Sequence, residues 1–167
     1  MNTNRSLSTF RFNLALLAFC ALSACSTKEE VVVPTPDPTV LQLKLQTGQQ
    51  LNPDIEGRAS PLVVRIYQFD TIDKFNTSDF FAIYDNDEAL LGKSLQFRRE
   101  LELQPGSSQE ITLIAKPEAR YLAVFAAFRN LDTAQWRASM PIALHQTTTA
   151  VIQFDRYTVT LTPQNNN

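Results

Sequence analysis

The sequence predicts an all-β protein, a two-sheet antiparallel sandwich of about eight strands with a short helical insertion between the second and third strands. Two observations lead to this fold class. From Val40 onward, most segments alternate apolar and polar residues or are rich in β-branched and aromatic ones, which is typical of strands. Only residues 71–92 place their apolar residues at helical spacing.

The first three expected strands differ in how deeply they should be buried. Residues 41–46 alternate strictly, which predicts one apolar face and one solvated face. Residues 62–69 are β-branched and aromatic, as in a more buried strand. In residues 95–104 the alternation predicts an inward set of Leu95, Phe97, Leu101 and Leu103. The outward set is Gln96, Arg98, Glu100, Glu102 and Gln104, which we interpret as a solvated face.

The remaining strands follow a turn at residues 105–108. Residues 110–115 should point Ile111 and Leu113 inward. Residues 121–128 are apolar throughout, which indicates a central strand covered on both faces. Residues 135–140, 149–154 and 157–161 complete the set of about eight.

The helical insertion is expected as one or two short helices within residues 71–92. Its apolar residues at helical spacing are Phe75, Phe80, Ile83, Tyr84, Leu90 and Leu91. Ser78 with Asp79 provides a helix start, and Gly92 provides a stop.

The first 24 residues have the composition of a secretory signal. Arg5 and Arg11 supply positive charge, and residues 12–22 form an apolar run that is too short to span a bilayer, which takes roughly 20 residues. Leu22-Ser23-Ala24-Cys25 fits the bacterial lipobox, in which the cysteine, here Cys25, is lipidated and becomes the first residue of the mature protein. The alternative is a plain cleaved signal peptide. Because Ser26 and not an aspartate follows Cys25, we expect delivery to the periplasmic face of the outer membrane.

The domain organisation follows from these boundaries: a signal peptide (1–24), a lipidated cysteine with a proline-rich linker (25–40), the sandwich (41–163) and a polar tail (164–167). Cleavage leaves 143 of the 167 residues, enough for one domain. The leader holds two basic and no acidic residues, so the formal charge of −2 becomes about −4. Such a charge argues against a nucleic-acid partner.

The candidate catalytic and metal-ligating residues are few, and each has a structural interpretation. His145 is the sole histidine and lies in the expected loop after Met140 and Pro141, so an exposed loop histidine is favoured over a member of a catalytic triad. Residues 85–88 cluster three carboxylates, but they lack calcium-loop spacing and also suit the start of a helix. Trp136 could stack on a ligand or pack at a strand start. We therefore expect no enzyme, no metal and no cofactor beyond the lipid on Cys25.

The loop between the first two expected strands is unusually long. About fifteen residues, 47–61, join strands that two to five could connect. Long ordered loops on rigid scaffolds often bind partners, and the apolar Leu51 and Ile55 suit an anchor with a polar rim. The alternative is a loop that folds back over the sandwich edge. The predicted partner-binding residues are Leu51, Asn52, Pro53, Asp54, Ile55, Glu56, Gly57 and Arg58.

Several segments resemble the TssJ lipoproteins of type VI secretion. They are residues 51–54 with 57–68, residues 79–84 with 89–92, and residues 126–129 with 134–137, all downstream of the lipobox. The resemblance implies a transthyretin-like sandwich anchored by acyl chains in the outer membrane. It also implies a structural role: docking the periplasmic C-terminal domain of TssM, mainly through residues 47–60, with no small-molecule substrate.

Two further expectations accompany this resemblance. In an antiparallel meander, loops 1–2, 3–4 and 5–6 should share one end, which makes residues 105–108 and 130–134 candidates for the rim of the contact. The alternative function is a periplasmic small-ligand-binding lipoprotein that uses the sandwich interior. The filled alternation of large apolar residues argues against that alternative.

Overall fold

The computed structural model describes residues 35–164. The predicted signal peptide, the lipidation site at Cys25, most of the linker and the last three residues lie outside this range. Within the described residues, no helix is long and apolar enough to cross a membrane.

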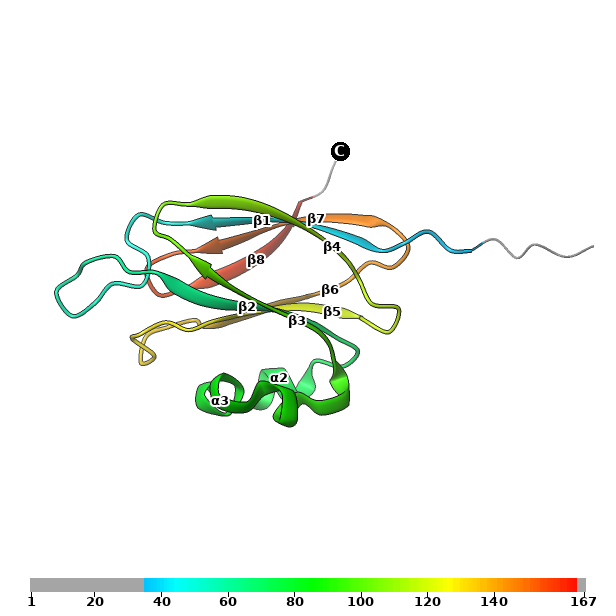
Figure 1. The fold of residues 1–167 in the computed structure, drawn as a ribbon, viewed down its shortest axis with the longest axis horizontal. Helices are drawn as coiled ribbons and strands as arrows, with labels where there is room; N and C mark the ends of the chain where they lie inside the picture. Colours follow the sequence, from blue (N-terminus) through cyan, green and yellow to red (C-terminus); the bar gives the residue numbers. More distant parts are fainter. Residues whose placement is uncertain (1–34, 165–167) are drawn as a thin grey trace, which may run out of the picture. The chain divides into compact units, whose positions relative to one another are not determined.

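Eight strands in the described part of the chain form two four-stranded sheets (Figure 1). One sheet has the order β4-β1-β7-β8 and the other β3-β2-β5-β6. The strands are β1 (Val40–Thr47), β2 (Leu62–Phe69), β3 (Leu95–Leu103), β4 (Ser108–Ile114), β5 (Tyr121–Ala126), β6 (Arg137–Pro141), β7 (Thr147–Phe154) and β8 (Val159–Gln164). The predicted eight-stranded sandwich is confirmed.

One pairing departs from the antiparallel prediction, because β1 and β7 run parallel. Parallel neighbours need a long crossover between them. Here the crossover is the whole of the second sheet with its helices and β4, since β1 and β7 are separated by five strands in the chain. The other named strand pairs are antiparallel.

The alternation of apolar and polar residues along the strands distinguishes the buried face of a sheet from its outer face, as the sequence predicts. In β1, Leu41, Leu43 and Leu45 are buried between the sheets, while the intervening polar residues point outward. In β5, Val124 packs in the same inter-sheet core, whereas Phe125 packs on the opposite side of its sheet. The predicted coverage of β5 on both faces is therefore correct.

The helical insertion covers the outer face of the β3-β2-β5-β6 sheet (Figure 1). It consists of α2 (Asp73–Thr77), α3 (Phe80–Leu91) and a 3-10 turn, η1 (Gly92–Ser94). Asp79 caps α3 by accepting a hydrogen bond from the Ala82 N–H at 3.0 Å. Gly92 ends α3 with φ +56°, a value that favours glycine. Both predicted helix signals are correct.

The outward face of β3 is not the solvated surface that we expected. Arg98 and Glu100 form ion pairs there, with Asp87 of α3 and Arg65 of β2 as partners. A bulge between Gln68 and Phe69 shifts the register of β3, and Leu95 packs with the helical cluster and not between the sheets. Alternation alone cannot reveal a helical layer that is folded over the polar side of a strand.

The loops that precede β2, β4, β6 and β8 gather at one end of the sandwich (Figure 1). This agrees with the prediction for loops 1–2, 3–4 and 5–6. We call this region the loop end; it comprises residues 48–61, 104–107, 127–136 and 155–158. Residues 35–39 enter β1 at the opposite end (Figure 1). β1 thus runs from the end at which residues 35–39 enter it to the loop end.

Candidate functional site

The long β1–β2 loop is fixed to its neighbours at its first residues. The Thr47 hydroxyl donates to the Gln104 carbonyl at 2.7 Å and accepts from the Ser107 N–H at 2.7 Å. The Gly48 N–H donates to the Phe154 carbonyl at 2.8 Å, and the Gly48 carbonyl accepts from the Gly106 N–H at 3.2 Å. These bonds join the β3–β4 and β7–β8 connections to the start of the loop.

Asn52 fixes the base of the loop a second time. Its side-chain Nδ2 donates to the Pro61 carbonyl at 2.9 Å, and its Oδ1 accepts from the Arg129 N–H at 2.9 Å. Its own N–H donates to the Arg156 carbonyl at 3.1 Å. Asn52 has φ +44°, a conformation that asparagine tolerates better than most residues. Asn52, through its side chain and its backbone N–H, therefore connects three loops.

The far part of the loop is a small hydrogen-bonded turn. The Asp54 carboxylate accepts from the backbone N–H groups of Glu56 and Arg58 at 3.0 and 2.9 Å and pairs with Arg58 Nε at 2.9 Å. The Gly57 N–H donates to the Asp54 carbonyl, and Gly57 takes φ +80°, which its missing Cβ allows. The hydrogen bond from the Arg58 N–H is the main cause that lowers the pKa of the Asp54 carboxyl.

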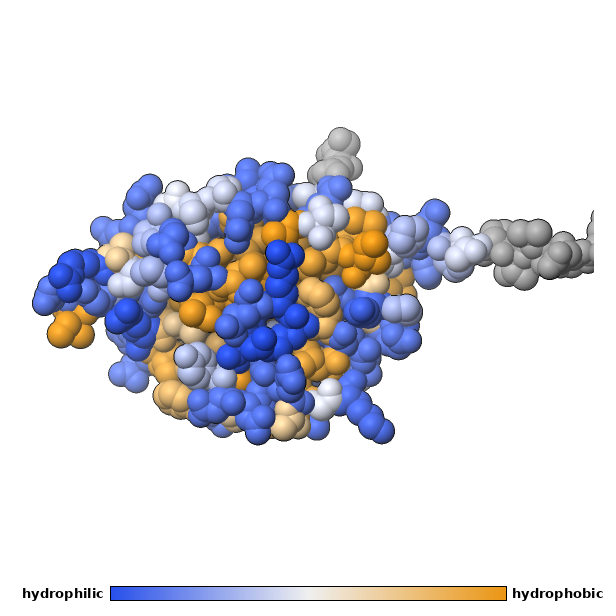
Figure 2. Space-filling view, in the orientation of Figure 1, coloured by the Kyte–Doolittle hydropathy of each residue, from blue (hydrophilic) through white to orange (hydrophobic). Residues whose placement is uncertain are grey.

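The turn presents Ile55 to solvent. Ile55 is 103% exposed and lies between charged neighbours, and Figure 2 shows an apolar side chain at the tip of this projecting loop amid hydrophilic ones. The Ser60 N–H donates to the Leu51 carbonyl at 3.0 Å and so closes the neck of the loop below this tip. The tip is thus a structured knob with one apolar side chain.

Leu51, which we expected to form an exposed apolar anchor together with Ile55, is fully buried in the inter-sheet core. That expectation is wrong for Leu51. Asn52 and Pro53 are buried as well, whereas Glu56, Gly57 and Arg58 are exposed. The loop is therefore partly a cover over the sandwich edge and partly an exposed surface, so each of the two sequence interpretations is correct for some of its residues. Residues 51–53 and 60 fold back to close the end of the core, and residues 54–59 project from it.

The two predicted rim segments lie at the same end as this loop. Residues 105–108 contact it through the Gly106 and Ser107 bonds described above. The segment after β5 is held by the Arg129–Asn52 bond, and the Gln135 N–H donates to the Tyr157 carbonyl at 2.9 Å. The loop end is thus a surface assembled from four connections and not one isolated loop.

A buried charge network ties α3 to the sheet, and sequence reasoning missed it. Asp87 Oδ2 accepts from Tyr67 Oη at 2.6 Å, from Arg98 Nε at 2.8 Å and from Arg65 Nη1 at 3.1 Å. Glu100 accepts from Arg65 Nε at 2.8 Å. Burial raises the pKa of Asp87, but the hydrogen bonds from Tyr67 and Arg98 and the charges of the two arginines outweigh it, so the net pKa is lowered.

This network has the features of a structural clamp. The Asp87 carboxylate accepts four hydrogen bonds, counting the one from the Glu88 N–H to Oδ1, so its acceptor sites are filled. Burial and the Asp87 bond raise the pKa of Tyr67, which keeps its hydroxyl protonated. The signal in the sequence was Arg65, a lone charge inside an otherwise apolar strand. A buried charge requires a partner, and residues 85–88 supply one.

The other sequence candidates take their structural interpretations. His145 is exposed in the β6–β7 connection, and its backbone N–H donates to Thr39 Oγ1. Trp136 packs edge-on against Phe80 and Phe125 at 5.4 and 5.5 Å, and Arg137 lies 4.5 Å above its ring. Within residues 35–164, His, Cys, Asp and Glu side chains form no group of three that could hold a metal ion.

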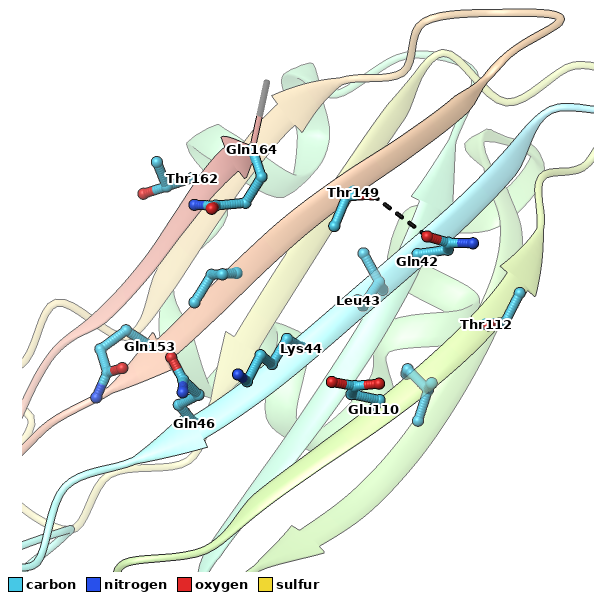
Figure 3. A pocket seen from close by; sticks show the side chains of 12 residues that line it. Gln42, Leu43, Lys44, Gln46, Glu110, Thr112, Thr149, Gln153, Thr162 and Gln164 are labelled. Carbon is cyan, nitrogen blue, oxygen red and sulfur yellow. Dashed lines mark hydrogen bonds between the residues drawn. The ribbon is translucent and has the colours of Figure 1, made fainter. Parts of the chain in front are cut away.

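A polar hollow of about 830 Å³ lies on the outer face of the β4-β1-β7-β8 sheet (Figure 3). Amide and hydroxyl side chains such as Gln42, Gln153 and Thr162 line it beside Lys44 and Glu110. It is an open sheet surface on the solvent side of β1. The space between the sheets is instead filled by buried apolar side chains, which leaves the alternative of an interior ligand site without support.

These features define a class of protein: a packed β-sandwich with a clamped helical layer and a structured projecting loop, suited to a structural role. Residues 39–157 match the family model of the type VI secretion lipoproteins, described as VasD, EvfM and TssJ. The chain therefore belongs to the TssJ family of type VI secretion lipoproteins. It is a structural lipoprotein of a type VI secretion system and not an enzyme.

Solved structures agree with this assignment. The type VI secretion lipoprotein TssJ1 of Pseudomonas aeruginosa is 29% identical, with a TM-score of 0.75; the match covers 78% of this chain and 99% of that one. The Serratia marcescens protein Lip, a membrane-bound component of its type VI secretion system, is 24% identical with a TM-score of 0.70, over 78% and 99% of the two chains. No curated protein matched.

Two further structures share the fold. A chain of a structure described as a type VI membrane complex is 23% identical with a TM-score of 0.66, over 76% of this chain and 98% of that one. A chain of a structure described as the TssM C-terminal domain from EAEC is 23% identical with a TM-score of 0.60, over 75% and 98%.

Proposed function

We propose that this lipoprotein is anchored through acyl chains on Cys25 to the periplasmic face of the outer membrane and docks the periplasmic C-terminal domain of TssM through its loop end. The predicted partner-binding set then divides into two roles. Ile55, Glu56, Gly57 and Arg58 contact the partner, and Leu51, Asn52, Pro53 and Asp54 hold the loop in place.

The observation that carries the docking proposal is the fully exposed Ile55 on a hydrogen-bonded turn. An apolar side chain with a charged rim is the arrangement of an interface anchor. The loop base is bonded to three other connections, so little conformational entropy is lost when a partner binds. Chains with this fold occur in structures described as a type VI membrane complex and as a TssM C-terminal domain, which supports the choice of partner.

The direction of β1 supports the arrangement of anchor and dock. β1 starts at Val40, next to the first described residues, and its eight residues end at Thr47, at the loop end. A strand of this length spans about 26 Å. A tether attached before Val40 therefore leaves the loop end on the far side of the sandwich, free to meet a partner that comes from the inner membrane.

In this proposal the acyl chains hold the protein at the membrane and thereby favour binding of the partner. Each buried methylene contributes about 0.8 kcal/mol, and one acyl chain alone gives only marginal attachment, whereas two or more hold a protein stably. A permanent anchor raises the local concentration of the loop end near its partner, so a moderate interface suffices. Replacing Cys25 with Ser should release the domain from the membrane and abolish secretion.

The docking experiment is a calorimetric titration of residues 26–167 with the periplasmic domain of TssM. The truncated chain is a fair reagent, because the solved relative from Pseudomonas aeruginosa matches this domain over 99% of its own length. We expect saturable binding that weakens at least about tenfold in Ile55→Asp, since loss of an interface anchor costs about 2 kcal/mol or more and a tenfold change in Kd is about 1.4 kcal/mol.

The matched control is Ile114→Asp. Ile114 is 68% exposed and pairs with Val40 on the edge strand β4, at the opposite end of the sandwich. This variant should bind like the wild type. Wild-type binding that Ile55→Asp leaves intact would show that the contact lies elsewhere, and no binding by the wild type would remove TssM as the partner.

A further inference from the structure

Two aromatic side chains of α3 lie outside the packed face of that helix. Phe81 is 60% exposed and Tyr84 is 43% exposed, whereas Ile83 and Leu91 of the same helix are fully buried. Figure 2 shows hydrophobic surface over the part of the molecule where α3 lies. The packing of α3 does not require an apolar residue at position 81, and exposed aromatic residues are enriched among the residues that dominate binding energies.

The exposed rings are held in place by the residues beneath them. Phe80 stacks on Phe125 at 4.9 Å, and Tyr84 stacks on Phe80 at 5.6 Å. Phe81 meets Phe80 edge-on at 5.3 Å, and the Arg65 guanidinium lies 5.4 Å from the Tyr84 ring centre. Rings that are already ordered lose little entropy when a partner covers them.

The first turn of α3 is continuous with the loop end. Phe80 contacts Trp136, the last residue of the β5–β6 segment, at 5.4 Å. Arg137 Nη1 donates to the carbonyls of Phe75 and Ser78, each at 2.8 Å, so the turn between α2 and α3 is bonded to the start of β6. The other side of the β5–β6 segment is bonded to Asn52 at the base of the docking loop.

We propose that Phe81 and Tyr84 form a second contact for the same TssM domain. This contact extends the interface from the Ile55 knob across the loop end to α3. This inference rests on the proposed docking function. The two sheets are about 10 Å apart, and the helical layer lies about as far from the sheet that it covers. The loop end and the first turn of α3 therefore fall within one interface of standard size, about 800 Å² per partner.

The residues around Phe81 and Tyr84 indicate which side chains the partner must present. Asp85 is exposed one turn beyond Phe81, and Glu88 is exposed just past a kink in α3 at Asn86, where φ is −152° and ψ is 49°. The complementary surface is therefore an apolar recess that receives the Phe81 ring, bordered by lysine or arginine side chains that face the two carboxylates. The partner thus makes one apolar contact at each end of its footprint.

The test repeats the titration with Phe81→Gln and Tyr84→Gln, because glutamine is polar and a good helix former. Phe81→Gln should keep the thermal unfolding temperature of the wild type, because Phe81 is 60% exposed. Tyr84→Gln should lower that temperature modestly, because it removes the stacking on Phe80 and the contact with Arg65. Phe81→Gln should raise the Kd about tenfold, and its effect should add to that of Ile55→Asp, because the two residues lie in different layers. Ile114→Gln should bind like the wild type.

The outcomes separate this inference from the function on which it rests. Wild-type binding that weakens in Ile55→Asp but not in Phe81→Gln overturns the aromatic contact and leaves the docking proposal intact. Weakening in Phe81→Gln alone moves the interface onto α3 and overturns the extended footprint. Absence of wild-type binding overturns both proposals together.

Discussion

The side-chain amide of Asn52 joins two loops that are 77 residues apart in the chain, because its Oδ1 accepts the N–H of Arg129 at 2.9 Å. The same amide donates to the Pro61 carbonyl at 2.9 Å, so both ends of the long loop and the β5–β6 segment meet at one buried side chain. Asn52 therefore sets the position of the projecting turn relative to the rest of the loop end.

We predict that Asn52→Ala lowers the free energy of unfolding by about 1–3 kcal/mol, because it removes two partly buried hydrogen bonds, to the Pro61 carbonyl and from the Arg129 N–H, and places alanine at a positive φ. Urea unfolding measures the change. Asn52→Gly is the control, since glycine loses the same two bonds but accepts φ +44° without strain. An alanine variant as stable as the wild type would show that the amide does not hold the loop.

Leu51 and Ile55 should respond oppositely to the same substitution, although they are four residues apart in one loop. Leu51→Asp places a charge in the inter-sheet core and should prevent folding, and the milder Leu51→Ala should cost about 2–5 kcal/mol. Ile55→Asp should leave stability within about 0.5 kcal/mol of the wild type. Thermal unfolding of the three variants is the measurement, and equal losses at both positions would contradict the described loop conformation.

Asp87→Asn should be strongly destabilising, by about 3 kcal/mol, because Arg65 and Arg98 lose the carboxylate that compensates their partly buried charges. Glu100→Gln is the matched control. It removes another carboxylate from the same network at a position that is 45% exposed, where an ion pair contributes under about 1 kcal/mol. Similar losses in the two variants would argue against a buried clamp at Asp87.

The turn that carries Ile55 should depend on pH. The pKa of Asp54 is lowered below its ordinary value of 3.8, so the folded turn favours the ionised carboxylate. Its stabilising contribution is then complete above the unfolded pKa and is lost as the pH falls through the lower folded value. Titration of the Asp54 carboxyl by NMR should give a midpoint below 3.8, and Asp54→Asn should abolish the pH response of the Arg58 amide, which donates to that carboxylate. A midpoint at or above 3.8 would contradict the described hydrogen bonds.

The fold was largely predictable because strand alternation and helix caps are local signals. The alternation of residues 41–46 and the start and stop residues Asp79 and Gly92 required no knowledge of distant neighbours. The parallel pairing of β1 with β7 was not predictable, since alternation reports which face is buried and not which strand lies alongside.

The site was only partly predictable for the same reason. Leu51 and Ile55 are equally apolar in the sequence, and the hydrogen bond between the Leu51 carbonyl and the Ser60 N–H determines which one turns into the core. Arg98 and Glu100 read as a solvated face until α3 is folded over them. Tertiary contacts, and not local composition, decide these positions.

The most direct test of the whole account is site-specific photo-crosslinking of the full-length lipoprotein in living cells. A benzophenone amino acid at position 55 should crosslink to TssM, and the same amino acid at position 114 should not, because position 114 pairs with Val40 at the opposite end of the sandwich, where residues 35–39 enter β1. Crosslinking to TssM from position 114 and not from position 55 would contradict a lipoprotein that is anchored at one end and docked at the other.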